Sequence, residues 1–165
     1  MSRAFVKEGA GDDDLPDLPP SPHPNYTTPA GREALAARLG VAQRSLTAAL
    51  ADQAAGRVPA DGRSVPQWQR EIRWLEARLA AAIVVQPSTT APERVAFGVR
   101  VQLEDAERRH YCFRIVGEDE ADPDRGDISW VSPLATALLG ARVDDEVLWP
   151  RPEGPLEVTV LALGR

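Results

Sequence analysis

The chain is poor in the residues that build most metal and redox sites. Its 165 residues include one cysteine and two histidines, and aromatic residues make up 5% of the composition. A single thiol excludes an internal disulfide framework and most thiolate metal sites. We interpret Cys112 as a small buried apolar residue in a reducing compartment. No run of 18 apolar residues and no apolar signal core are present. These absences predict a cytoplasmic protein without a membrane span.

Motifs of self-contained enzymes are also missing. The sequence has no glycine-rich phosphate loop and no paired-histidine metal motif. His23 lies among prolines and is interpreted as an exposed ring, and His110 as a surface residue at the start of a strand. The acidic run 117–124 lacks the spacing of an EF-hand and is expected to be a solvated loop. We therefore expect no enzyme acting alone, no cofactor of its own and no sequence-specific DNA binding.

Charge and proline content divide the chain into four segments. Residues 1–25 are acidic and proline-rich, which is typical of a disordered tail. Residues 26–85 have helical periodicity, and within 26–90 eight arginines outnumber five acids. The stretch 86–93, "QPSTTAPE", is predicted to be a linker. Residues 91–165 are acidic, with fifteen acids against nine arginines, and the apolar residues of 94–165 alternate as in half-buried strands. The two units thus face different surroundings or simply have solvated surfaces of opposite sign.

The helical segment predicts an antiparallel hairpin with coiled-coil spacing. Thr28 is the expected N-cap of the first helix, with Pro29 at its first position. Apolar residues then recur at intervals of four and three in both arms. The predicted seam comprises Leu35, Leu39, Ala42, Leu46 and Ala49 on one arm, facing Ile83, Leu79, Leu75, Ile72 and Trp68 on the other. This register places the hairpin tip near 57–65.

The C-terminal segment predicts a small antiparallel sheet with one short helix. Strands are expected within 94–105, 108–119, 145–150 and 155–163. In "SPLATALLG", Ser132 is the expected N-cap, Pro133 takes the first helical position and Gly140 follows the end. The whole chain is therefore assigned to the α+β class, a helical hairpin followed by a sheet domain.

A long stretch of this segment resembles a known family. "FRIVGEDEADPDRGDISWVSPLATALLG", residues 113–140, is similar to the C-terminal signature of the bacterial Gre transcript-cleavage factors. "YTTPAGREAL" is similar to the opening of that family's N-terminal hairpin. The resemblance covers residues 26–165 and implies an FKBP-like fold for the sheet domain.

The resemblance also implies a partner. Gre factors bind bacterial RNA polymerase at the mouth of its secondary channel, and their hairpin reaches toward the active centre. By position in the signature, Ser129, Ser132 and Pro133 would lie in the docking region, or they serve only helix capping and turn formation. A monomer that contacts nascent RNA inside the channel is the expected arrangement.

The predicted tip departs from the family pattern. There the resemblance implies an Asp, followed three residues later by a Glu, which together hold a Mg²⁺ ion shared with polymerase. Asp61 matches the first acid, but Ser64 stands in place of the second, and Arg63 adds a positive charge beside them. We expect Arg57, Asp61, Arg63 and Ser64 to be the tip contacts.

Three functions are compatible with this tip. The chain could be an elongation regulator that binds the secondary channel but stimulates cleavage weakly or not at all. It could be a working cleavage factor that uses Asp61 with another acid, such as Asp52. It could also be a binding module on the same fold for a partner other than polymerase. The sequence favours the first interpretation, because half of the metal-binding pair is absent.

Overall fold

The structure, a computed structural model, describes residues 21–164 and divides into two compact units. One is built on residues 34–80, and the other on 23–33 together with the chain from 81 onward. The prediction of a tail over 1–25 falls mostly outside the described residues. The elements are β1 (Tyr26–Thr27), α1 (Pro29–Ala54), α2 (Val65–Ala80), β2 (Ile83–Val84), β3 (Arg100–Asp105), β4 (His110–Val116), β5 (Asp127–Ser129), α3 (Pro133–Leu138), β6 (Glu146–Trp149) and β7 (Leu156–Gly164). Short 3-10 turns, η2 (Glu118–Glu120) and η3 (Pro123–Arg125), lie between β4 and β5.

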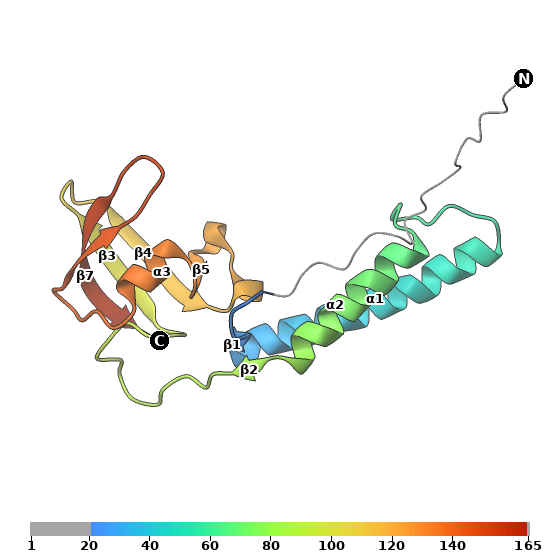
Figure 1. Cartoon of the computed structure of the whole chain (residues 1–165), viewed down its shortest axis with the longest axis horizontal. Coiled ribbons are helices and arrows are strands. Elements are labelled where there is room, and N and C mark those ends of the chain that lie inside the picture. Colours follow the sequence, from blue (N-terminus) through green and yellow to red (C-terminus); the bar gives the residue numbers. More distant parts are fainter. Residues whose placement is uncertain (1–20, 165) are drawn as a thin grey trace, which may run out of the picture. The chain divides into compact units, whose positions relative to one another are not determined.

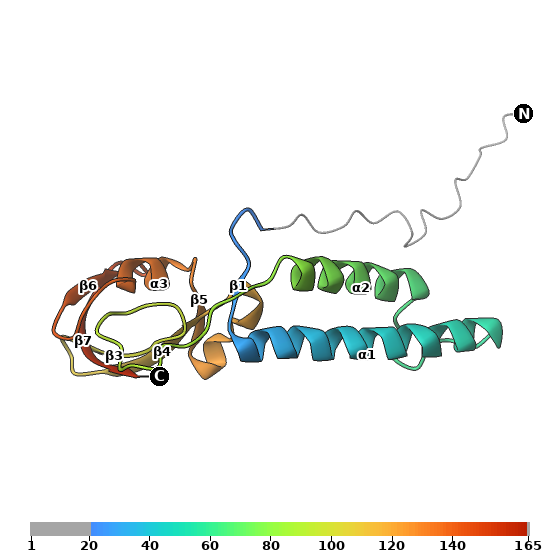
Figure 2. The same ribbon diagram turned by 90° about the horizontal axis from the view of Figure 1, so that it is seen from below.

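The hairpin unit is formed by α1 and α2, which run side by side (Figure 2). Its core is one apolar cluster contributed by both helices. The buried members are Leu35, Ala42, Ala49, Trp68 and Leu75, with Leu39, Leu46 and Ile72 among the partly buried side chains around them. These are the residues of the predicted seam. The exception is Ile83, which was wrongly assigned to the seam: it belongs to β2 and is 48% exposed, because the second helix ends at Ala80.

The second unit is built around a five-stranded sheet in the order β5-β4-β3-β7-β6 (Figure 1 and Figure 2). Neighbouring strands are antiparallel except at one edge, where β5 pairs in parallel with β4. The sequence did not predict β5, because a three-residue strand is too short to show alternation. Helix α3 buries Leu134, Ala135 and Leu138 against Leu103 and Val160 of the sheet. The α+β class is confirmed.

A two-stranded parallel sheet, which the sequence analysis missed, also belongs to this unit. Tyr26 pairs with Ile83, and Thr27 pairs with Val84. The Tyr26 ring lies 5.1 Å from the Trp130 ring, and the exposed His23 ring meets the same indole edge-on at 5.9 Å. Asn25, at the end of the predicted tail, is buried at 5% exposure. The residues just before α1 are therefore ordered parts of the sheet unit.

Two predictions about the strands are corrected by the sheet. Residues 94–99 precede the first long strand, which begins at Arg100. Cys112 is exposed rather than buried. On β4, Tyr111 and Phe113 pack against the core, and the alternation of a strand therefore turns Cys112 to the other face.

Candidate functional site

At the hairpin tip, backbone hydrogen bonds close the C-terminal end of α1. The N–H of Gly56 donates to the Gln53 carbonyl at 3.1 Å, and the N–H of Arg57 donates to the Asp52 carbonyl at 2.8 Å. Gly56 has a φ of 65°, the left-handed conformation that glycine adopts without strain. This pair of bonds is the Schellman motif, which satisfies carbonyls left over at a helix end. The sequence "AAGR" therefore ends α1 at a defined point.

After the tip, a capping box closes the N-terminal end of α2. Ser64 precedes α2, and its backbone N–H donates to Oε1 of Gln67 at 2.9 Å. The N–H of Gln67 donates back to the Ser64 hydroxyl at 3.4 Å. This reciprocal pattern fixes the start of a helix. Ser64, which stands where the resemblance requires a glutamate, thus has a structural role.

Arginines occupy two of the three carboxylates at and beside the tip. Asp52 accepts from Arg57 at 2.7 Å, and Glu71 accepts from Arg63 at 2.5 Å. The exposed Asp61 accepts the backbone N–H of Arg63 at 2.9 Å. The guanidinium of Arg63, predicted to lie beside Asp61, instead stacks 3.8 Å from the centre of the Trp68 ring.

The carboxylate oxygens at the tip do not fit a Mg²⁺ ion. Such an ion needs several oxygen ligands and is favoured by carboxylates that are not already paired with cations. Asp61 is the only acid between residues 55 and 64, and the predicted helper Asp52 is held by Arg57. Within residues 21–164, no group of three or more His, Cys, Asp or Glu side chains is arranged to hold a metal ion.

The predicted docking residues lie together where β5 leads into α3. Ser132 is the N-cap of α3, since its hydroxyl accepts the N–H of Ala135 at 3.2 Å, and Pro133 takes the first helical position. The Ser129 carbonyl accepts the N–H of Ser132 at 2.9 Å. Pro133 is exposed, whereas both serines are half-buried. The capping role is thus realised, and it leaves Pro133 at the surface.

The main functional candidate that the sequence analysis missed is Glu120. It was counted in a solvated acidic loop, but its Oε1 accepts the Thr27 hydroxyl at 2.9 Å and the Thr28 N–H at 2.8 Å. Its Oε2 accepts the Thr28 hydroxyl at 2.5 Å. The spacing of the two motifs, 92 residues apart, gave no signal for this contact. The only hint was that both motifs belong to the family signature.

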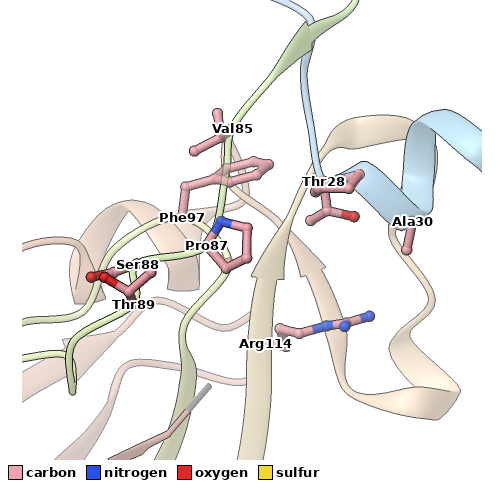
Figure 3. A pocket seen from close by; sticks show the side chains of 10 residues that line it. Thr28, Ala30, Val85, Pro87, Ser88, Thr89, Phe97 and Arg114 are labelled. Carbon is pink, nitrogen blue, oxygen red and sulfur yellow. The ribbon is translucent and has the colours of Figure 1, made fainter.

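A pocket of about 590 Å³ adjoins the start of α1 in the sheet unit (Figure 3). It is lined by Thr28, Pro29, Ala30, Val85, Pro87, Ser88, Thr89, Phe97, Gly98 and Arg114. Arg114 donates two hydrogen bonds of 2.9 Å to the buried carboxylate of Asp127. This pairing raises the pKa of the Arg114 guanidinium, and the nearby charge of Glu120 adds to the effect. Because Arg114 is already neutralised by Asp127, the pocket is mainly apolar and carries no strong anion site.

Comparisons with known proteins find the same family that the motifs of this chain resemble. The family model of the C-terminal domain of the transcription elongation factors GreA/GreB matches residues 89–165. The transcription elongation factor GreB of Neisseria meningitidis serogroup A is 37% identical over 151 residues, which cover 84% of this chain and 93% of that protein. GreB of Xanthomonas axonopodis pv. citri is 51% identical over 78 residues, covering 47% of this chain and 46% of that protein.

Among solved structures, the GreA factor homolog 1 protein of Thermus thermophilus is 26% identical, with a TM-score of 0.42. That comparison covers 87% of this chain and all of the other. None of the helices within residues 21–164 combines the length and the apolarity needed to cross a membrane. Since the similarity to GreB extends over nearly the full length of that relative, the chain belongs to the GreA/GreB family of transcription elongation factors.

Proposed function

We propose that this chain binds RNA polymerase at the mouth of the secondary channel and regulates elongation with little or no stimulation of transcript cleavage. In this proposal the hairpin tip reaches toward the active centre and contacts nascent RNA, and the factor works through the polymerase rather than as an enzyme. The observation that carries the proposal is the pairing of Asp52 with Arg57 and of Glu71 with Arg63. Asp61 alone would hold a shared Mg²⁺ too weakly for strong cleavage.

The first experiment uses backtracked elongation complexes with labelled RNA and Mg²⁺. The chain is added at saturating concentration, and release of 3′ RNA fragments is followed with wild type and with Asp61→Ala. We expect little cleavage from either, together with inhibition of a cleavage-competent Gre factor added at the same time. Rapid cleavage by wild type that Asp61→Ala abolishes would make the chain a working cleavage factor and overturn the proposal.

A gain-of-function variant sharpens this test. Ser64→Asp places a second carboxylate near Asp61 and keeps a good helix N-cap, because aspartate caps helices about as well as serine. Combined with Arg57→Gln, which releases Asp52, it should raise cleavage above that of wild type. Arg44→Gln, a charge change in the body of α1, is the matched control and should leave cleavage unchanged.

The docking role of the turn before α3 is tested separately. Pro133 is exposed, and aspartate is favourable in the first turn of a helix, so Pro133→Asp changes the surface without removing the Ser132 cap. We expect weaker capture by core polymerase and weaker competition. Failure of wild type to bind polymerase would favour a binding module for a different partner.

A further inference from the structure

Glu120 completes the cap of α1 from a distant part of the chain. Thr28 is the N-cap of α1, since its hydroxyl accepts the N–H of Gly31, three residues on, at 3.0 Å. In a local capping box, the side chain at this third position accepts the N–H of the N-cap residue. Here that position is Gly31, which has no side chain. The acceptor for the Thr28 N–H is Glu120 in η2.

Gly31 and Gly117 lie next to this contact, where there is no room for a side chain. A Cβ atom built on Gly31 would overlap the side chain of Glu120, whose Cδ, Oε2 and Cγ are its three nearest atoms. A Cβ atom on Gly117 would collide with the Tyr26 carbonyl and would lie 2.9 Å from Oε1 of Glu120. Any side chain at Gly31 would therefore displace the carboxylate, and one at Gly117 would push apart β1 and the turn that carries Glu120.

The contact is charged and largely withdrawn from water. Thr27 is buried at 2% exposure, and Glu120 is half-buried. A carboxylate that receives three donors from β1 and from the N-cap residue also interacts favourably with the positive end of the helix.

From these contacts we propose that Glu120 is a positioning residue: its carboxylate fixes the first turn of the helix that leads to the tip, and the effect on elongation depends on it. The functional half of this inference rests on the proposed function. The structural half, that the carboxylate is the distant member of the α1 cap, stands independently of any partner.

The first test measures hydrogen exchange on the full chain without polymerase. Glu120→Gln and Thr28→Val should each lower protection of the amides in the first turn of α1 by about tenfold, while the sheet amides stay protected. Thr28→Ser keeps the hydroxyl and should restore protection. Asp124→Asn, an exposed acid in the neighbouring η3 turn, is the matched control. Unchanged protection in Glu120→Gln would overturn the cap.

The second test uses the steric relation between Gly31 and Glu120. Gly31→Ala should lower the melting temperature, whereas the same change at Gly40, further along α1, should raise it slightly, because the nearest atom to a Cβ there is a flexible Arg44 nitrogen at 3.4 Å. In a Glu120→Ala background the Gly31→Ala change should no longer be harmful. An equal loss in both backgrounds would show that Gly31 does not make room for Glu120.

The last test separates positioning from simple stabilisation. At a temperature where all variants are folded, Glu120→Gln should reduce the maximal effect on elongation complexes several-fold relative to Asp124→Asn. A normal effect from Glu120→Gln, with reduced protection at the first turn, would leave only a structural cap and overturn the positioning role. If wild type itself does not affect elongation, the proposed function fails with the positioning role, and hydrogen exchange still decides the cap.

Discussion

The N-terminal ends of α1 and α2 are capped in different ways. Each helix begins with backbone N–H groups that lack partners within the helix. At α2, Ser64 and Gln67 satisfy two of them with a contiguous capping box. At α1, Thr28 is joined by Glu120, which comes from the far side of the sequence.

This difference separates local from long-range stabilisation. The cap of α2 depends on four consecutive residues and should form wherever that helix forms. The cap of α1 requires the turn η2, which follows β4, to be in place, because Glu120 lies in η2. The α2 cap is thus local, whereas the α1 cap depends on contacts between distant segments.

The largest expected effect tests the packing between the two helices whose caps are compared. Leu75→Ala removes a fully buried side chain from the hairpin core and should lower the free energy of unfolding by about 3 kcal/mol. Urea unfolding followed by tryptophan fluorescence measures this loss. Ala77→Ser, at an exposed position on the same helix, is the control. A loss below that of an ordinary surface change would mean that the two helices do not form a packed core.

The next effect compares a long-range ion pair with a local one. Asp127→Ala leaves Arg114 without its bidentate partner in a half-buried place and should cost about 2 kcal/mol. Asp52→Ala breaks the pair with Arg57, whose side chain is 64% exposed, and should cost under about 0.5 kcal/mol. Thermal unfolding of both variants gives the ranking. The reverse order would remove the distinction between the two kinds of contact.

A smaller effect is expected from the local cap. Ser64→Ala removes the hydroxyl that accepts the Gln67 N–H and should lower the free energy of unfolding by about 1 kcal/mol. Ser64→Asp should retain most of that free energy, because aspartate also caps helices. Circular dichroism during thermal unfolding is sufficient to measure both. Should Ser64→Ala unfold like wild type, the start of α2 would depend on packing rather than on its cap.

The last prediction concerns acid stability and the buried carboxylate of Asp105. Burial by itself raises the pKa of this group. Hydrogen bonds from the Arg109 backbone N–H, the Tyr111 hydroxyl and the Arg109 guanidinium outweigh burial and hold the pKa below its ordinary value. Stability from Asp105 is therefore complete above the pKa of the unfolded chain, about 4, and is lost as the pH falls through the lower folded value.

Asp105→Asn removes this source of pH dependence. The variant should be less stable than wild type at neutral pH, and the gap should narrow as the pH is lowered toward 3. Urea midpoints measured from pH 7 to pH 3 check the prediction. Glu107→Gln, an exposed neighbour in the same turn, should keep the acid slope of wild type. A constant gap between Asp105→Asn and wild type would exclude a lowered pKa.

The sequence alone determined the elements that rest on short-range patterns. The apolar spacing of α1 and α2 identified the residues of the hairpin core, because a helix brings residues three and four apart onto one face. The cap of α3 was also predicted, since Ser132, Pro133 and Gly140 act within a few residues of one another. The signature in residues 113–140 indicated the family before the fold was known.

Only the tertiary structure decided which acidic side chains form hydrogen bonds or ion pairs, and with which partners. No spacing rule connects Glu120 with Thr28, or directs the Arg63 guanidinium to Glu71 and Trp68 rather than to Asp61. The exposure of Ile83 and the short strands β1, β2 and β5 also depended on chain segments that meet only after folding. Sequence periodicity reports which face of an element is apolar, but the partner of a charged side chain is set by whichever distant group the finished fold places within hydrogen-bonding reach.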